Sequence, residues 1–469
     1  MGDRMTFEAR LAEAYLRYGE GAPADVDVDA VARAAIAAAH HRRLDLRSSL
    51  PVLWSPLPRP VRLAIVSGLL LALGVSLIWV AGVLLKPPPP LPSLSPLWDM
   101  SIARVNPIVV PLDDGRVLIG GGGIEDDDGE APAVELLDPA TGTTTIIEGA
   151  TPSGFGTGVE LADGRVFVIG YDANHTCALA FIVDTAWQMS RELPREGPCN
   201  RPPFAVQGSM AKLTDGRVLV TGGRTDVYAG AIASSASVFD PVTEQFMPTS
   251  PMSSPRIGHA LAVLADGRVV VAGGYARPSD EPLASIEIYD PASGSFAAAG
   301  AMQAIQGATS GVTLPDGRVL LLPDAAQGVR DAQPEGFHFA PRAIDPRASI
   351  EIFDPSTGRS SVVGSVPNQV SGAYLVSDGR VLVHGWVSGR VLPSGRLGAP
   401  EVGFAWAAIV DPATGETVDL AAPRTAMSRS AQMSDGRVLL VGGLEYPPLN
   451  SRGRPSGFAT VAPFIDVFD

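Results

Sequence analysis

The segment Asp266–Asp290 reads DGRVVVAGGYARPSDEPLASIEIYD and decides the fold. It opens on Asp-Gly, a dipeptide of tight hairpin turns in which glycine supplies a positive φ. Apolar residues alternate on both sides of this turn, in Ala260–Leu264 and in Val269–Val271. An alternation of this kind predicts two antiparallel strands, each with one face buried.

The tetrapeptide Asp-Gly-Arg-Val occurs seven times, beginning at Asp114, Asp163, Asp215, Asp266, Asp316, Asp378 and Asp435. A second turn, Asp-Pro-x-Thr/Ser-Gly, follows at Asp138, Asp290, Asp354 and Asp411, with a degenerate copy at Asp240. In this turn proline fixes φ and glycine takes the left-handed position. Each repeat therefore has four strands, A to D. Seven such repeats predict an all-β, seven-bladed β-propeller over residues 97–469.

The two ends of this region predict how the ring closes. Phe464–Asp469 matches a strand C, and no strand D follows it. Leu97–Met100, followed by Arg104, parallels Phe246–Met252, followed by Arg256. We therefore expect the N-terminal strand to supply strand D of the last blade, which leaves no open edge between the first and last blades.

An uncharged stretch, Leu63–Leu85, precedes the repeats. A helix of this length spans a bilayer core of about 30 Å, so residues 61–85 are predicted to form one transmembrane helix in the lipid bilayer. Arginines before the span favour a cytoplasmic N-terminus, with residues 1–60 as a short helical cytoplasmic segment. The proline-rich residues 86–96 form a linker to an extracytoplasmic propeller. Small residues at every fourth position would permit a weak homodimer through the helix: Ala64, Gly68, Ala72 and Ser76.

The repeat pattern resembles the kelch repeat, with glycine doublets at Gly120–Gly121, Gly222–Gly223, Gly273–Gly274 and Gly442–Gly443. The resemblance covers residues 97–469, although repeats two, five and six lack the doublet. It implies a bacterial, membrane-anchored propeller similar to the central propeller of galactose-oxidase-like enzymes. Those copper enzymes need two tyrosines, one of them linked to cysteine, and two histidines. The histidines here, at positions 175, 259, 338 and 384, lie in different repeats, so we expect no copper site, no cofactor and no enzyme activity.

Strand alternation places all Asp-Gly and Asp-Pro turns on one face of the propeller, the turn face. The B–C and D–A loops lie on the other, the loop face, and the longest of them are Pro323–Asp345 and Trp386–Phe404. Long loops on a rigid scaffold are where binding residues usually lie. Candidate ligand-binding residues on this face are Tyr171, Arg224, Tyr275, Trp386, Tyr446, Arg104 and Arg256. Aromatic rings and arginines suit a sugar or an acidic polymer. In the alternative interpretation, the aromatics pack between blades and the arginines cap backbone carbonyls.

Two further features lie in the loops. Asp126, Asp128 and Glu130 offer oxygen ligands for calcium, but their spacing does not follow a known calcium loop, which favours a solvated acidic loop, and no other metal site is indicated. Cys177 and Cys199 fall in loops of the same face and are a candidate disulfide in an oxidising compartment. The net charge of −15 makes nucleic acid a poor partner.

The sequence thus predicts a single-pass cell-membrane protein whose propeller binds or adheres to a glycan or protein ligand outside the cell. An alternative is a transmembrane signalling receptor, because the cytoplasmic segment is similar in layout to that of membrane-bound anti-sigma factors. A second alternative is a galactose-oxidase-like enzyme.

Overall fold

The computed structural model describes residues 91–104, 106–122, 133–149, 153–171, 178–194, 208–224, 231–277, 282–304, 308–323, 347–367, 370–388, 403–425, 428–445 and 460–469. The regular elements in these ranges are all β-strands. No helix among them is long and apolar enough to cross a membrane. The helix predicted at 61–85, the segment 1–60 and residues 86–90 of the linker lie outside the described residues.

The first four blades follow the chain in order. Blade 1 has β2 (Ile108–Pro111), β3 (Val117–Gly120), β4 (Val134–Asp138) and β5 (Thr143–Gly149). Blade 2 has β6 (Ser153–Glu160), β7 (Val166–Tyr171), β8 (Ala178–Asp184) and β9 (Met189–Glu192). Blade 3 has β10 (Ser209–Lys212), β11 (Val218–Thr221), β12 (Ala236–Asp240) and β13 (Gln245–Pro248). Blade 4 has β14 (Ala260–Val263), β15 (Val269–Ala272), β16 (Ser285–Asp290) and β17 (Ser295–Ala301).

Three more blades complete the ring. Blade 5 has β18 (Ala308–Thr313), β19 (Val319–Pro323), β20 (Arg347–Asp354) and β21 (Arg359–Pro367). Blade 6 has β22 (Val370–Leu375), β23 (Val381–Ser388), β24 (Gly403–Val410) and β25 (Thr417–Asp419). Blade 7 has β26 (Arg429–Gln432), β27 (Val438–Val441), β30 (Phe464–Phe468) and β1 (Leu94–Asp99). A short pair, β28 (Leu444–Glu445) and β29 (Thr460–Val461), extends the loop of blade 7.

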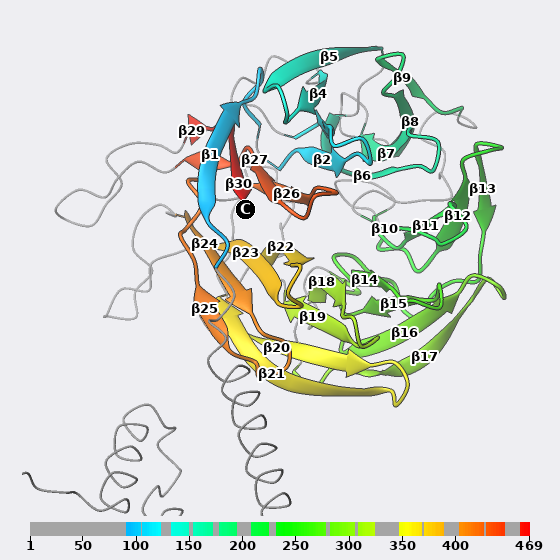
Figure 1. Ribbon diagram of the computed structural model, residues 1–469. Coiled ribbons are helices and arrows are strands. Elements are labelled where there is room, and N and C mark those ends of the chain that lie inside the picture. Colours follow the sequence, from blue (N-terminus) through cyan, green and yellow to red (C-terminus); the bar gives the residue numbers. More distant parts are fainter. Residues whose placement is uncertain are drawn as a thin grey trace, which may run out of the picture. The chain divides into compact units, whose positions relative to one another are not determined.

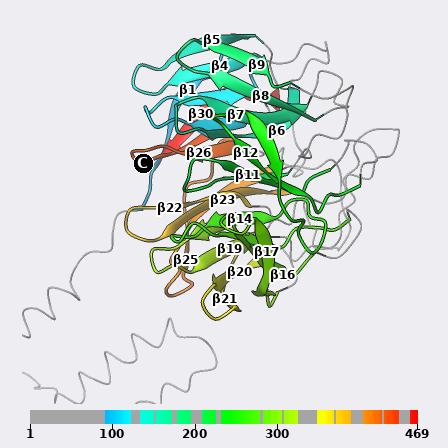
Figure 2. The same cartoon turned by 90° about the vertical axis from the view of Figure 1, so that its right-hand side faces the viewer.

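The blades surround a common centre, with strands A innermost and strands D at the rim, as Figure 1 shows. Five blades are separate four-stranded sheets, and blades 1 and 2 form one eight-stranded sheet. The link between them is a short parallel pairing of β5 with β9, seen at the rim in Figures 1 and 2. The predicted all-β propeller is therefore confirmed, and the described residues make seven four-stranded units.

The Asp-Gly-Arg turns have one geometry in all seven blades. Their glycines have φ between 82 and 90°, a range that favours glycine. In each turn the arginine donates its backbone N–H and its side-chain Nε to the aspartate two residues earlier, as Arg268 does to Asp266 at 3.1 and 2.8 Å. The repeated arginine is thus part of the turn and not a basic ring for a ligand.

Apolar side chains fill the space between neighbouring blades. Every residue of β3, β11, β15 and β27 is buried, because a strand B inside a blade is covered on both faces. Between blades 2 and 3, Phe167 stacks on Phe239 with ring centroids 4.2 Å apart. Packing of this kind keeps the blades in fixed positions.

The N-terminal strand closes the ring as predicted. β1 pairs antiparallel with β30, from Leu94 opposite Phe468 to Asp99 opposite Phe464. The indole of Trp98 then lies against Gly142 in the C–D turn of blade 1, where an added Cβ would overlap it. Blade 7 is therefore built from both ends of the propeller and is held to blade 1 by a tryptophan.

At each of the other junctions where a blade with a C–D turn follows its neighbour, the contact lies at the same place in the turn. The left-handed residue of each turn meets the outer part of the preceding blade. Glu148 N–H donates to Gln188 O at 3.1 Å, Arg191 pairs with Glu244, and Ser250 N–H donates to Gly294 O at 3.1 Å. Gly300 and Gly364 lie so close to the carbonyl oxygens of Gly358 and Gly415 that a Cβ on either would overlap them. Each C–D turn is therefore also the joint to the blade before it.

Substitution of Gly142 tests the closing contact. Gly142→Ala places a side chain in the left-handed region, at a cost of about 1–2 kcal/mol, and displaces the Trp98 indole, at a further cost of about 1–3 kcal/mol. Gly294→Ala is the matched control, because its φ of 64° resembles the 70° of Gly142 and an added Cβ meets nothing within 4 Å. Equilibrium urea unfolding should show the larger loss for Gly142→Ala, and equal losses would contradict the role of Trp98.

Candidate functional site

The loop face is the predicted binding face, and the described residues show how its loops are supported. In blade 6, β23 and β24 continue their pairing as far as Ser388 opposite Gly403. The loop expected at Trp386–Phe404 is therefore corrected at both ends, since Trp386 and Phe404 belong to strands. The β28–β29 pair extends the B–C loop of the neighbouring blade 7. Two adjacent blades thus carry short ribbons that project from the same face.

A buried arginine joins the base of the B–C loop to the D–A segment in blade 4. Arg256 is fully buried and donates from Nη1 to Gly273 O at 2.8 Å and to Ser285 O at 3.1 Å, the two ends of the loop. Its Nη2 contacts Glu287 Oε1 at 2.7 Å. Glu287 also accepts from the N–H and hydroxyl of Ser253, both at 2.9 Å. Burial raises the pKa of Glu287, but these hydrogen bonds outweigh it, so its pKa lies below the ordinary value.

Blade 1 repeats this arrangement. Arg104 donates to Gly121 O at 2.9 Å and also to Ala133 O, and its Nη2 pairs with Glu135 at 3.0 Å. Burial lowers the pKa of Arg104, and Glu135 partly restores it. The assignment of Arg104 and Arg256 as ligand-contacting residues is therefore corrected, because both guanidinium groups are enclosed and paired. They cap backbone carbonyls, as the alternative interpretation states, and together with their carboxylates we call them the loop clamps.

Blades 5 and 7 use related carboxylates. Glu351 accepts from the N–H groups of Gln303 and Ala304 at 2.8 and 2.7 Å. In blade 7, two residues share the contacts that a single arginine makes in blades 1 and 4. Thr425 donates to Gly442 O at 2.7 Å, and Arg424 donates to Asp466 at 2.8 Å. Sequence reasoning missed these carboxylates, although an acidic residue in the middle of an apolar strand C, as in SIEIYD, is a visible signal.

The other candidate residues have mixed outcomes. Arg224, Tyr275 and Trp386 are half-buried and lie at the ends of strands B in blades 3, 4 and 6. Tyr275 pairs with Ile257, which ties it to the D–A segment of its own blade. These three residues thus come from three different blades. Tyr171 ends β7, and the remaining candidates lie outside the described residues: Tyr446, Asp126, Asp128, Glu130, Cys177 and Cys199.

A polar cluster that the sequence did not reveal lies between blades 6 and 7. The hydroxyl of Ser430 is 2.6 Å from His384 Nε2 and 2.8 Å from the Tyr374 hydroxyl. Gly372 permits this approach, because a Cβ there would overlap the Ser430 hydroxyl. Burial lowers the pKa of His384 to about 3 and raises that of Tyr374 to about 12. A histidine of such low basicity is poorly suited to activate a serine at neutral pH, so the cluster reads as an inter-blade contact.

His259 makes the corresponding contact between blades 3 and 4. Its Nε2 lies 2.7 Å from Thr221 Oγ1, and burial lowers its pKa to about 3. His259 and His384 thus lie in different blades, each next to a hydroxyl group. Across the described ranges, no group of three or more His, Cys, Asp or Glu residues is placed to hold a metal ion.

Removing one partner of a loop clamp should destabilise the fold strongly. Glu287→Ala leaves the Arg256 guanidinium buried without its carboxylate, which costs about 3–5 kcal/mol. Arg268→Ala breaks the ion pair with Asp266. The side chains of Arg268 and Asp266 are 43% and 51% exposed, so this substitution should lower the free energy of unfolding by less than about 1 kcal/mol. Urea unfolding of both variants measures the difference, and similar losses would contradict the structural role of the clamp.

The two buried histidines predict a loss of stability in acid. Their pKa in the folded protein is about 3, against 6.5 ordinarily, so below pH 6.5 the unfolded chain binds protons that the folded protein does not. Stability is complete above pH 6.5 and falls toward pH 3, by about 1.4 kcal/mol per pH unit for each histidine. Unfolding between pH 7 and 4 should show a shallower dependence for His259→Gln combined with His384→Gln. Parallel curves of unfolding free energy against pH for the variant and the parent would refute this role of the histidines.

Comparison with known proteins agrees with this architecture. Residues 256–303 match the family model of the Kelch motif. A solved structure of a fungal alcohol oxidase of the AA5 family, in complex with copper, is similar with a TM-score of 0.54 and 16% identity, covering 81% of this chain and 76% of that one. At this identity the likeness shows the fold alone. A search of curated proteins found no match. The matched repeat and the arrangement of the blades support the assignment of the described residues to a kelch-repeat β-propeller.

Proposed function

We propose that the chain is a membrane-anchored, extracytoplasmic binding module that holds a protein ligand on its loop face. Kelch-repeat propellers are typical protein-binding modules, and the matched repeat supports that general role. The anchor rests on the uncharged stretch Leu63–Leu85, and the orientation rests on the arginines that precede it.

The loop clamps are the observation that carries this proposal. Arg104 and Arg256 each bond to both ends of a B–C loop and to a buried carboxylate. Buried ion pairs are a costly way to gain stability, since apolar residues of similar volume often serve equally well. What the clamp supplies in addition is a fixed base for a loop that differs in length and sequence between blades. A rigid base with variable loops is the general design of protein recognition surfaces.

Site-specific photo-cross-linking tests which face binds. We would replace Arg277, an exposed residue in the B–C loop of blade 4, with benzoylphenylalanine in the full-length chain on intact cells. The matched control carries the same group at Ala413, which is exposed in the C–D turn of blade 6 on the turn face. Protein adducts from position 277 and only background from position 413 are expected.

The same experiment separates the alternatives. Equal adducts from both positions would contradict a loop-face site. No adduct at position 277, together with binding of the full-length chain on a glycan array, would replace the protein ligand with a carbohydrate. Cross-linking only after cell lysis would contradict the extracytoplasmic orientation.

A further inference from the structure

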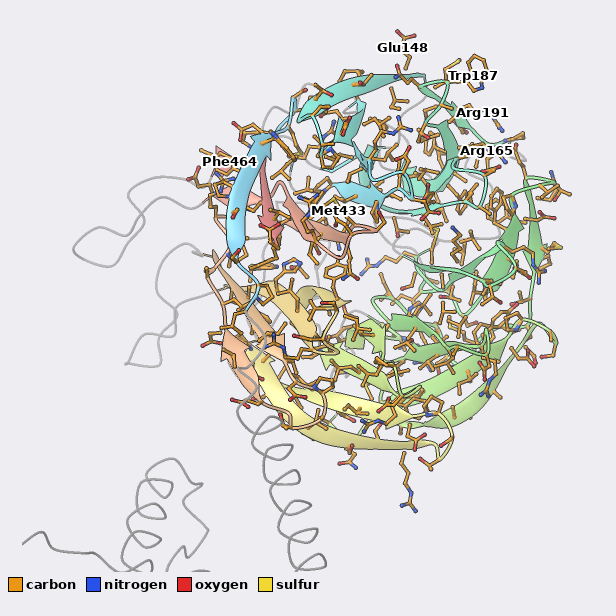
Figure 3. All side chains as sticks on the ribbon, in the orientation of Figure 1. Glu148, Arg165, Trp187, Arg191, Met433 and Phe464 are labelled. Atoms are coloured by element: carbon orange, nitrogen blue, oxygen red, sulfur yellow. The ribbon has the colours of Figure 1, made fainter. Side chains whose placement is uncertain are left out.

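Three strongly exposed apolar side chains lie on the turn face, away from the loops. They are Trp187 and Met189 at the rim of blade 2 and Val242 in the C–D turn of blade 3, which are 79%, 60% and 90% exposed. Figure 3 shows Trp187 at the rim, near Glu148 and Arg191. We call these three residues the rim patch. Trp187 and Val242 lie in neighbouring turns of two adjacent blades.

The turns do not need these side chains in order to form. The position of Trp187 carries Thr141, Ser293, Thr357 or Thr414 in the other blades, and that of Val242 carries Ala140, Ala292, Ser356 or Ala413. The opening aspartate accepts the same N–H bond in all six turns, including those from Ala186 to Asp184 at 3.1 Å and from Val242 to Asp240 at 2.9 Å. A large exposed apolar side chain is thus an addition to a turn that is already complete.

Each of the two turns is held against the blade before it. Gln188 and Glu244 replace the usual glycine and keep positive φ values of 53 and 55°, which disfavours any side chain. Glu244 accepts from Arg165 Nη1 at 2.6 Å and from Arg191, and Arg165 also donates to Pro241 O at 2.8 Å. Glu244 therefore fixes the C–D turn of blade 3 against the A–B turn and the outer strand of blade 2, and Gln188 joins the C–D turn of blade 2 to Glu148 in blade 1. A pre-formed surface binds more tightly than a mobile one because less freedom is lost on binding.

The negative charge around the rim patch favours a positively charged partner. The two turns and their outer strands carry four carboxylates and one guanidinium group: Asp184, Glu192, Asp240 and Glu244 against Arg191. Around them lie Glu148 and two ion pairs, Asp163 with Arg165 and Asp215 with Arg217. Arg165 and Arg191 are also both paired with Glu244. The surface thus presents an exposed indole and methyl groups within an excess of negative charge.

We propose that the rim patch docks a basic, apolar peptide segment of a protein partner. Aliphatic side chains would cover Val242 and Met189, and a lysine or arginine would lie over the face of Trp187, where the π-system attracts a cation. The surrounding carboxylates attract the same cation. Tryptophan and methionine are enriched at the centres of protein interfaces. This site lies on the opposite face from the proposed ligand site and is independent of it.

Fluorescence anisotropy tests the proposal with the full-length chain and a short labelled peptide that alternates arginine with leucine. A peptide that alternates glutamate with leucine is the charge control. Trp187→Thr installs the residue of the other turns, so it should leave the unfolding midpoint unchanged while weakening the arginine peptide at least about ten-fold. Val242→Ala should weaken it less. Val362→Ala, which removes an exposed apolar side chain in blade 5, should leave binding unchanged.

Three results would overturn the proposal. The first is equal binding of the arginine peptide by the parent and Trp187→Thr chains. The second is Trp187-dependent binding of neutral oligosaccharides in place of the peptide, which would make the patch a sugar site. The third is self-association that depends on Trp187 in sedimentation velocity, which would make the occupant a second copy of this chain.

Discussion

The left-handed residue of each C–D turn is where one blade is joined to the next, and the ring depends on it. A row of sheets closes into a ring only when each junction between neighbouring sheets has the same geometry. Here the turn of one blade meets the outer part of the preceding blade through a carbonyl oxygen, a glycine, a tryptophan or an ion pair. The chemistry changes from junction to junction, but the place of contact does not. Blade 7 has no C–D turn because its strands C and D, β30 and β1, are not consecutive in the chain. At its junction with blade 6 polar contacts serve instead: Ser430 with His384 and Tyr374, and Gln432 with the carbonyl of Leu375.

The two faces of the propeller follow from this arrangement. The C–D turns of the turn face are constrained because they are also joints, and most of their side chains are small. The loops of the loop face do not join blades. They differ in length and sequence only beyond the base that the loop clamps hold in place. Where the turn face departs from its own pattern, at Trp187, Gln188, Val242 and Glu244, two adjacent blades depart together and an inter-blade ion-pair network accompanies the change.

Much of the fold could be predicted from the sequence because its signals are local. The residues of the Asp-Gly-Arg and Asp-Pro turns determine the conformation of each turn, and the seven copies of the repeat define the blades and the closing strand. The candidate site was harder, because burial is a property of the assembled ring. Arg104 and Arg256 look like surface arginines until a strand C carboxylate, 31 residues away in each case, is placed beside them. The partners of Ser430 are similarly 46 and 56 residues distant, and no spacing rule connects them. Trp187 was hidden because its turn, Asp184–Gln188, lacks both the proline and the glycine of the Asp-Pro-x-Thr/Ser-Gly pattern.

The closing strand also determines how the propeller responds to mechanical force. β1 is joined to β30 by backbone pairing and by apolar packing of Leu94 and Trp98, and the chain enters the ring at Leu94, beside Phe468. A pull on the N-terminal side of Leu94 acts along the axis of β1, so the paired residues up to Asp99 resist it together and not one after another. This shearing geometry is the stronger way to load a pair of strands. An adhesive propeller tethered through this end would therefore transmit tension to its rim through β1, with Trp98 lodged against Gly142 as an anchor point at the far end.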